Sequence, residues 1–323
     1  MSAEYSPTRD PSPASRNRER LVALLLALAP HEGYNLTALP SVRILRSNRA
    51  LSRTPVLYDP GIVIVCQGSK RGYFGGERYL YDEHHYLAVS VPVPFSMETD
   101  ATPDRPLLAL YLHLDFALAA ELAERIDREG GAESVQAPRS MMSTPMDDAM
   151  HASVLRFVEA MHRPLEAAIL GPALLRELYF RVLTGAQGHA MRSALAMRGQ
   201  FGRIGRSLRR IHADYAQPLD VRQLAAEAGM SVASFHSHFK AITQVPPMQY
   251  LKSTRLHQAR LLMVREDLTA EAAGYAVGYT SPSQFSREFK RLFGLTPAKE
   301  TKRMRDSFAI PAPFADAEYV SSH

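Results

Sequence analysis

The sequence predicts a multidomain α+β protein, in which a β-barrel or jelly-roll domain with flanking helices precedes an all-α domain with two helix-turn-helix motifs. Three observations predict this. A short pattern, Phe235–Lys240, recurs fifty residues later as Phe285–Lys290, and an alanine-rich stretch ending in glycine precedes each copy. Residues 55–115 alternate β-branched or aromatic runs with turn residues. Residues 116–190 show helical apolar spacing.

Length, composition and charge agree with two domains. The chain has 323 residues, 46% of them hydrophobic, which is enough for two cores. Residues 200–306 contain 17 Lys and Arg against 9 Asp and Glu, a formal charge of +8, whereas the whole chain is +5 and the remainder is therefore −3. The positive charge is concentrated around the repeat, as in proteins that bind nucleic acid. The single cysteine excludes a disulfide framework and predicts a cytoplasmic protein.

The N-terminus contains a segment that could be mistaken for an export signal. Residues 1–16 are rich in Ser and Pro and predict a disordered tail. Arg16–Arg20 and Leu21–Ala29 resemble the charged and apolar parts of a secretion signal. The apolar run has only nine residues, so we favour an amphipathic helix that packs on the following domain. No segment is apolar enough over its length to predict a membrane span.

The β-rich region contains six predicted strands: Gly61–Gln67, Lys70–Phe74, Arg78–Tyr81, Tyr86–Val91, Phe95–Thr99 and Leu107–Asp115. A ligand pocket is expected inside the barrel, where alternate side chains line it. The candidate lining residues are Val63, Val65, Cys66, Tyr73, Tyr79, Tyr86 and Tyr111. Successive strand residues point to opposite faces, so Ile62, Ile64 and Cys66 form one set and Val63 and Val65 belong to the other. The sequence leaves open which set faces inward. A tyrosine in such a strand is, however, more often simply part of a half-buried sheet.

A metal-dependent enzyme is the alternative for this region. Its candidate ligands are Glu83, His84, His85, His113 and Asp115. Adjacent strand residues point to opposite faces, which disfavours joint ligation by His84 and His85, and His113 with Asp115 supplies only two ligands. We therefore expect no catalytic residues, no metal and no cofactor.

Cys66 has two interpretations. Its apolar strand is typical of a small buried hydrophobic residue, which we favour. Nearby Lys70 and Arg71 would instead suit a thiol that senses electrophiles or oxidants, because cations lower the pKa of a thiol.

Helical spacing returns after the strands. Phe116–Arg128 predicts one helix, and Asp147–His162 and Leu165–Thr184 predict an antiparallel pair. Their wide apolar surface suits either packing on the barrel or a dimer interface. The low periodicity of 186–199 predicts a linker between a domain at 17–185 and one at 200–306, with a tail at 307–323.

Each helix-turn-helix copy has recognisable helix ends. In the first copy, Asp220 and Gln223 form a predicted capping box, and Gly229 ends the helix. Ser231 caps the second helix, whose inner face is Val232, Phe235 and Phe239. In the second copy the corresponding signals are Thr269, Gly278, and Ser281 followed by Pro282, with Phe285, Phe289 and Leu292 facing inward.

A long helix over Met248–Val264 is expected to hold the two copies at a fixed separation, with Lys252, Arg255 and Arg260 outward. Two helices held in this way could enter successive major-groove faces of DNA.

The outer faces of the two second helices are small, polar or basic, which suits base edges and phosphates. The candidate DNA-binding residues are Ala233, Ser234, His236, Ser237, Lys240, Ser281, Ser283, Gln284, Ser286, Arg287 and Lys290. Arg287 can form two hydrogen bonds to one guanine, using two nitrogens of its guanidinium. Lys240 and Lys290 each follow a buried Phe, so a phosphate contact or simple solvation is expected there.

Residues 200–303 resemble the DNA-binding domain of the AraC/XylS family of bacterial transcription regulators, most strongly over Ala276–Pro297. The resemblance implies that Ala233, His236 and Ser237 face bases in the first copy. It implies the same of Ser283, Ser286 and Arg287 in the second. Ser237 stands where many relatives have a longer polar or basic residue, so we expect the second copy to read bases more strongly.

Tyr58–Gly72 and Tyr86–Pro94 resemble the N-terminal cupin-like domain of one subgroup of the same family. The resemblance implies a small-molecule effector bound in this domain, a homodimer, promoter DNA as partner, and RNA polymerase as a further partner if the protein activates transcription. The alternative is a DNA-binding regulator whose N-terminal domain is only a dimerising scaffold and answers to no ligand.

Overall fold

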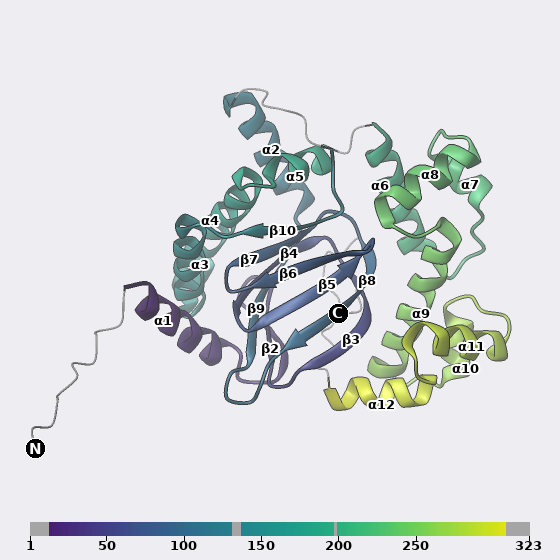
Figure 1. The fold of residues 1–323 in the computed structure, drawn as a ribbon, viewed down its shortest axis with the longest axis horizontal. Helices are drawn as coiled ribbons and strands as arrows, with labels where there is room; N and C mark the ends of the chain where they lie inside the picture. The colour runs from purple at the N-terminus through teal and green to yellow at the C-terminus, as the bar shows by residue number, and fades with distance from the viewer. Residues whose placement is uncertain (1–12, 131–136, 197–198, 308–323) are drawn as a thin grey trace, which may run out of the picture.

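The computed structural model describes residues 13–130, 137–196 and 199–307. A curled antiparallel sheet lies between a group of helices on one side and the all-helical C-terminal half on the other (Figure 1). Within the described residues, no helix has both the length and the apolar character that crossing a membrane requires.

The sheet has ten strands: β1 Gly33–Leu36, β2 Val42–Ser47, β3 Leu51–Tyr58, β4 Gly61–Gln67, β5 Ser69–Phe74, β6 Glu77–Asp82, β7 His85–Val89, β8 Val93–Asp100, β9 Leu107–His113 and β10 Met141–Pro145. The six predicted strands are present as β4 to β9, whereas β1, β2, β3 and β10 were not predicted. The hydrogen-bonded order is β1-β2-β9-β4-β7-β6-β5-β8-β3, and β10 pairs with β7.

The sheet curls into a half-barrel. Tyr58 of β3 and Tyr111 of β9 lie far apart in strand order, yet their ring centroids are 5.6 Å apart. Val63 and Val65 of β4 belong to the same core as these tyrosines and face the interior. The interior is therefore lined by Val63 and Val65 and not by the alternate set that contains Cys66.

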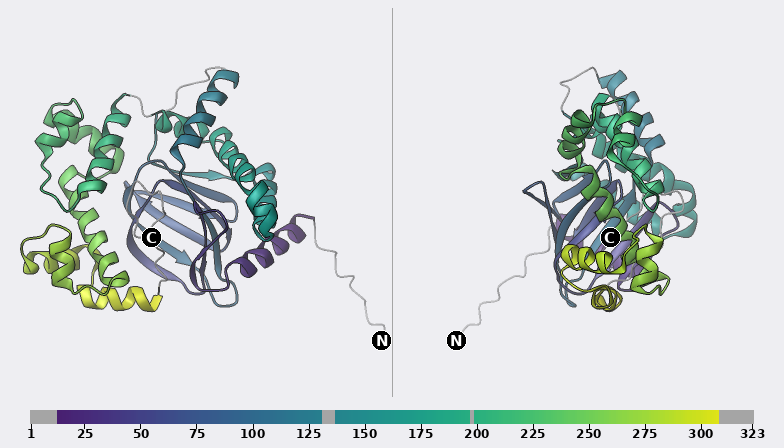
Figure 2. Two further views of the ribbon diagram at one scale, coloured as in Figure 1. Left: turned by 180° about the vertical axis from the view of Figure 1, so that it is seen from behind. Right: turned by 90° about the vertical axis from the view of Figure 1, so that its right-hand side faces the viewer.

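The opposite face of the sheet is covered by helices α1 Pro13–Leu28, α2 Phe116–Gly130, α3 Asp148–Met161, α4 Pro164–Thr184 and α5 Gly188–Leu195 (Figures 1 and 2). Ile62, Ile64 and Cys66 pack into this second core. The apolar run predicted as an amphipathic helix is part of α1, and Leu25 is fully buried in the same core.

Two expectations about segment boundaries are wrong. The segment 186–199, predicted as a linker, contains α5, and Ala190, Met191 and Ala194 of α5 are buried against neighbouring helices. Burial of these apolar side chains stabilises a helix that composition alone does not indicate. Helix α1 begins at Pro13, inside the predicted disordered tail, and the remainder of that tail lies outside the described residues, as do 197–198 and 308–323.

The C-terminal half consists of α6 Gly199–Asp214, α7 Val221–Glu227, α8 Val232–Thr243, α9 Pro247–Arg265, α10 Ala270–Ala276, α11 Pro282–Phe293 and α12 Pro297–Ser307. The predicted connecting helix is α9, which joins the two helix-turn-helix units and contacts β3 and β8 of the sheet (Figure 1).

Arg260 does not face outward as predicted. Its side chain is fully buried on α9, where Nη1 bonds Glu300 of α12 at 3.1 Å and the Pro55 carbonyl of β3 at 3.3 Å. Helix α12 and strand β3 cover the face of α9 that the sequence indicates as exposed. Arg255 is also only partly exposed, because its guanidinium bonds the carbonyls of Tyr215 and Gly278.

Candidate functional site

Four predicted N-cap residues begin the helices of the two helix-turn-helix units. Asp220, Ser231, Thr269 and Ser281 each accept a hydrogen bond from the backbone N–H three residues later, at 2.8 to 3.3 Å. The predicted capping box differs in one respect, because the Gln223 amide donates to Glu227 at 3.2 Å. Gly278 adopts a φ of 87°, and a Cβ there would clash with the Ala216 carbonyl, so a glycine is needed.

The phenylalanines of the repeat form the inner face of each second helix. Phe235 and Phe239 of α8 and Phe285 and Phe289 of α11 have no exposed surface. Val232 does not join them as predicted and is 42% exposed. It lies in the first turn of α8, where residues 231–233 are all exposed. Leu292 of α11 is only partly buried.

The predicted base-facing residues lie on exposed helix surfaces. Ala233, His236, Ser237 and Lys240 are exposed on α8, and Ser283, Ser286, Arg287 and Lys290 are exposed on α11. Ser231 is exposed, whereas the predicted contact residues Ser234, Ser281 and Gln284 are half-buried and take part in capping or helix-surface bonds. Arg287 forms no ion pair with any described residue, so its guanidinium is available to a ligand.

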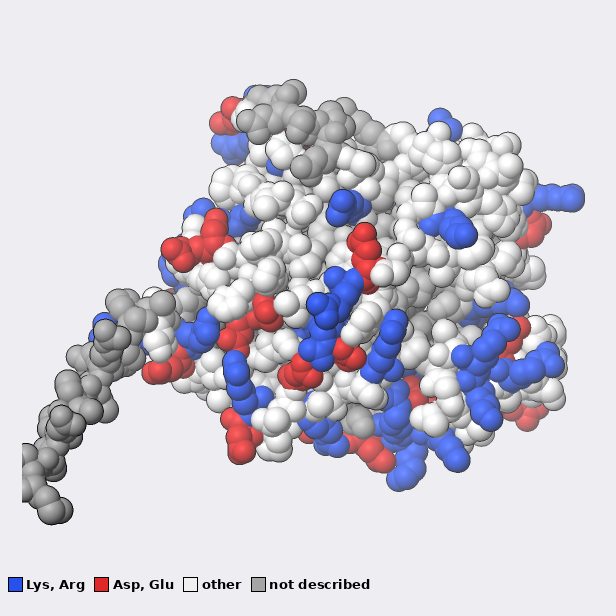
Figure 3. All heavy atoms as spheres, in the orientation of Figure 1, with Lys and Arg blue, Asp and Glu red and all other residues white. Residues whose placement is uncertain are grey.

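Helix α9 holds the two units together. Its 19 residues span about 28 Å at ~1.5 Å per residue, a length comparable with one turn of DNA, about 34 Å. Arg255 bonds a carbonyl of the first unit at Tyr215 (2.7 Å) and one of the second at Gly278 (3.3 Å). Lys252 bonds Glu288 of α11 at 3.1 Å. Basic side chains gather over the region of α10, α11 and α12 in Figure 3.

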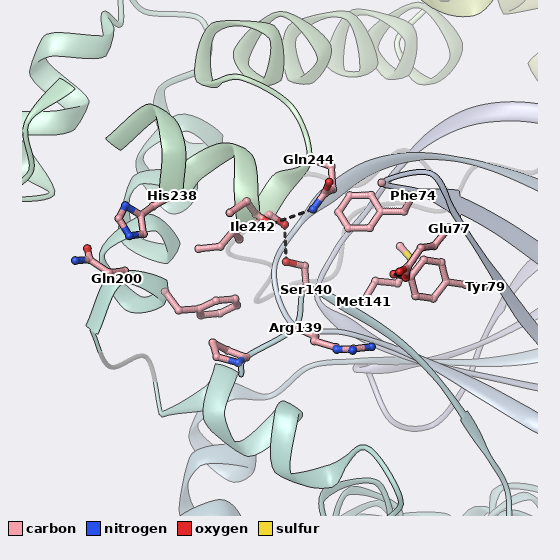
Figure 4. A pocket seen from close by; sticks show the side chains of 14 residues that line it. Phe74, Glu77, Tyr79, Arg139, Ser140, Met141, Gln200, His238, Ile242 and Gln244 are labelled. Atoms are coloured by element: carbon pink, nitrogen blue, oxygen red, sulfur yellow. Dashed lines mark hydrogen bonds between the residues drawn. The ribbon is translucent and has the colours of Figure 1, made fainter. Parts of the chain in front are cut away.

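A cavity of about 390 Å³ lies between the two halves of the chain (Figure 4). Its walls come from the β5–β6 hairpin, the segment before β10, and helices α6 and α8. Beside it, Ser140 Oγ donates to the Ile242 carbonyl of α8 at 2.6 Å. The tip of the hairpin at Gly75 packs against Gln244, the residue that ends α8. The N-terminal half therefore directly contacts the C-terminal end of α8, the second helix of the first helix-turn-helix unit.

The predicted effector-lining residues do not share one cavity. Val63, Val65 and Tyr111 face the interior of the half-barrel. Tyr79 lines the cavity between the two halves. Tyr86 and Cys66 belong to the helix-covered core, and Tyr73 lies on the outer side of β5, where its hydroxyl bonds Glu98 at 2.6 Å.

The interior also contains a charged residue that the sequence indicated as a neighbour of Cys66 but not as a lining residue. Lys70 of β5 is 1% exposed, and its Nζ donates to the Tyr58 hydroxyl at 2.9 Å. Burial lowers the pKa of Lys70 to about 7. Lys70 alternates with Gly72 and Phe74, which are also buried, and this two-residue period is the signal that could have identified it.

Cys66 is buried beneath α1 and α3, where it lines a cavity of about 490 Å³ with His84 and His151. Burial raises the pKa of its thiol to about 12. The nearby cations do not oppose this effect, because Lys70 faces the interior and Arg71 pairs with Glu98 and Asp100. These contacts favour the buried hydrophobic interpretation of Cys66.

The candidate metal ligands are dispersed. His85 bonds Asp82 at 2.9 Å, and Glu83 pairs with Arg18 and Arg105. The backbone around His113 and Asp115 bonds the Tyr179 hydroxyl. Nowhere in 13–130, 137–196 or 199–307 do three His, Cys, Asp or Glu side chains form a group that could hold a metal ion.

Comparison with known proteins adds two family matches. Residues 38–190 match the family described as AraC-type transcriptional regulator N-terminus, and residues 224–303 match a helix-turn-helix domain family.

Two curated proteins illustrate the sequence likeness. The RCS-specific HTH-type transcriptional activator RclR of Escherichia coli is 38% identical over 85 residues, which are 26% of this chain and 30% of RclR. The probable thc operon regulatory protein of Rhodococcus erythropolis is 27% identical over 208 residues, 61% of each chain. The chain thus matches about a third or less of the length of the first curated relatives.

Among solved structures, an apo form of a ToxT variant from Vibrio cholerae aligns with a TM-score of 0.54 at 11% identity, over 84% of this chain and 99% of ToxT. A structure of wild-type ToxT with an unsaturated fatty acid bound gives the same TM-score over 97% of ToxT. At this identity the likeness concerns the fold.

Proposed function

The chain belongs to the AraC/XylS family of transcription regulators, and on that premise we propose that it binds promoter DNA sequence-specifically under the control of a small molecule held in its N-terminal half. We place the protein in the cytoplasm, with RNA polymerase as a further partner if it activates transcription.

The DNA-binding part of the proposal rests on the exposed faces of α8 and α11, which helix α9 holds at a fixed separation. The exposed residues of α8 and α11 are small, polar or basic, and the region from 200 to 306 has a formal charge of +8. Phosphate contacts by Lys240 and Lys290 would position the protein, and Arg287 with Ser283 and Ser286 would read bases.

The experiment is to map the bound DNA genome-wide and then measure binding of one mapped site and a scrambled site by fluorescence anisotropy. We expect the mapped site to bind at least about 10³-fold more tightly than the scrambled site. Equal affinities for both would contradict sequence-specific regulation.

Strand β3 supports the effector part of the proposal, because it connects the interior to the DNA-binding half. Tyr58 of β3 faces the interior, whereas the carbonyl of Pro55 accepts a hydrogen bond from Arg260 of α9. A ligand that moves β3 would therefore change the position of α9 relative to the sheet. The ToxT structures, one with a bound unsaturated fatty acid and one with a naphthalenyl butenoic acid, give a precedent for small-molecule binding in this fold.

The competing scaffold hypothesis predicts no response to small molecules. A ligand that binds the native state must raise the melting temperature. We therefore expect at least one metabolite in a broad screen to raise the melting temperature of the full chain and to change its affinity for the mapped site. A screen without any shift would favour the scaffold.

We also propose that the protein is a homodimer that associates through α4. Leu165, Ile169 and Phe180 of α4 are 76%, 69% and 41% exposed, an unusual amount of apolar surface for one helix. Ile169→Glu should convert a dimer into a monomer in sedimentation velocity, whereas Glu166→Gln on the same helix should leave the dimer intact. A monomeric wild-type protein would refute this proposal.

A further inference from the structure

Lys70 lies in the interior of the half-barrel without an acidic partner among the described residues. Its Nζ lies 5.6 to 5.8 Å from the ring centroids of Tyr58, Tyr81 and Tyr111. None of the ion pairs formed within the described part of the chain includes Lys70. An ammonium group has three N–H donors, and the Tyr58 hydroxyl accepts one of them.

Burying the charged form of Lys70 costs free energy unless a further hydrogen-bond acceptor contacts its Nζ. Taking an ammonium group out of water is unfavourable, and tyrosine faces compensate only in part. Lysines this buried are uncommon without a paired charge. The two remaining donors therefore suit an acceptor that carries a negative charge.

A cavity of about 60 Å³ adjoins Lys70, and its wall includes Tyr34, Leu51, Met97, Thr99 and Leu107. At roughly 10–15 Å³ for each water-sized group, it holds about four to six such groups. Arg46 and Arg49 also line it. Arg49 is already paired with Glu32, and Arg46 bonds Asn48 and the Ala29 carbonyl.

We propose that this cavity binds a small monocarboxylate, whose oxygens accept hydrogen bonds from Lys70 Nζ and whose short apolar part packs on Met97 and Leu107. The proposal deepens the proposed function, on which it rests, by naming the chemical class of the effector. One buried cation balances one negative charge, which favours a carboxylate over a doubly charged phosphate.

The site implies a pH dependence with a definite sign. In the free protein the pKa of Lys70 is about 7, because burial disfavours its charged form. A bound carboxylate requires that form, so binding takes up a proton above this pKa and affinity falls as the pH rises.

Other groups that face Lys70 do not titrate in this range. They are the tyrosines at 34, 58, 81 and 111, from β1, β3, β6 and β9, and burial raises the pKa of each. Glu32 is the acidic residue in the cavity wall, and its hydrogen bond to Arg49 lowers its pKa.

The test is calorimetric titration of the full chain with acetate, propionate and butyrate, with propionamide as the neutral control. We expect at least one acid to bind and propionamide not to bind. Affinity should fall by up to tenfold per pH unit above about 7. In Lys70→Met the affinity should fall by at least about 10-fold, and in Tyr73→Phe, on the outer side of the same strand, it should be unchanged.

Unchanged affinity in Lys70→Met, or equal binding of propionamide, would overturn the proposal. If Lys70→Met fails to fold, Tyr58→Phe keeps the lysine but removes the hydroxyl that positions its Nζ, and should still weaken binding severalfold. Failure of all three acids would also overturn it, and DNA binding measured on the same sample would show whether the proposed regulator function survives.

Discussion

At the scale of single residues, the repeated Phe-x-x-x-Phe-Lys pattern acts mainly through its position in the core. Its four phenylalanines are fully buried, and they set which side chains of α8 and α11 face outward. The exposed residues differ between the copies. The first offers Ala233, His236 and Ser237, and the second offers Arg287 beside two serines. The fold is repeated, whereas the chemistry available for base contacts is not.

Arg287 and Lys290 should therefore behave differently when removed. Arg287→Ala should cost about 1–3 kcal/mol of binding to the mapped site and little on random DNA, because a bidentate contact to guanine is sequence-specific. Lys290→Ala should weaken both equally and reduce the salt slope by about 1. Anisotropy titrations at several salt concentrations measure both quantities. Equal losses on both DNAs for Arg287→Ala would remove its role in base recognition.

Cys66 should be chemically inert in the folded protein. With a pKa of about 12, the fraction of Cys66 present as thiolate is roughly one part in 10⁵ at pH 7. Because it is the chain's single cysteine, iodoacetamide labelling followed by mass spectrometry reports on it alone. We expect negligible labelling of the native protein and complete labelling in urea. Rapid native labelling would restore the sensor interpretation.

At the scale of helices and strands, the sequence predicted elements whose own residues show the period or the caps. The strands β4 to β9 and the capped helices α7, α8, α10 and α11 follow from such local signals. Strands β2 and β3 were missed because charged Arg43 and Pro55 interrupt their apolar pattern. Arg43 is nonetheless buried. The eight-residue helix α5 was missed because Gly188 and His189 mask its apolar spacing.

The candidate sites were predicted unevenly for the same reason. The exposed face of a recognition helix follows once its buried phenylalanines are located. The lining of the interior does not, because both faces of β4 are apolar and buried, so alternation cannot distinguish them. The burial of Arg260 depends on Glu300, forty residues away, and on β3. No local pattern contains that information.

The pairing of α9 with α12 gives a prediction at this scale. Glu300 has no exposed surface and bonds both Arg260 and Arg303. Glu300→Ala would leave the buried Arg260 charge without its partner, so the free energy of unfolding should fall by about 3–5 kcal/mol. Asp306→Ala breaks an exposed pair with Lys302 on the same helix and should cost about 0–1 kcal/mol. Urea unfolding of both variants measures the difference, and similar losses would contradict the role of the buried pair.

At the scale of the whole molecule, a hydrogen-bond chain links the two halves. The Tyr250 hydroxyl of α9 donates to the carbonyl of Pro92, which precedes β8, at 3.1 Å. With its proton used there, the hydroxyl accepts from Nε2–H of His212 on α6 at 2.7 Å. Burial lowers the pKa of His212 to about 3, so this imidazole remains neutral near pH 7.

The neutral His212 in this series of hydrogen bonds should make the protein sensitive to acid. Between about pH 6.5 and about pH 3 the unfolded state binds a proton at His212 that the folded state does not. The free energy of unfolding should therefore fall as the pH is lowered, by up to about 1.4 kcal/mol per pH unit from this residue. Urea unfolding at several pH values should show a shallower decline for His212→Gln than for the wild type. Parallel curves would show that His212 does not contribute.

The edge strand β3 has a consequence for solubility. An exposed sheet edge can recruit strands from other chains and so start aggregation. Pro55 has no amide hydrogen to offer an incoming strand, and its carbonyl is occupied by Arg260 of the C-terminal half. Helix α9 thus also shields the edge against polymerisation, and any state in which the C-terminal half moved away would uncover a strand that is protected there only by its proline.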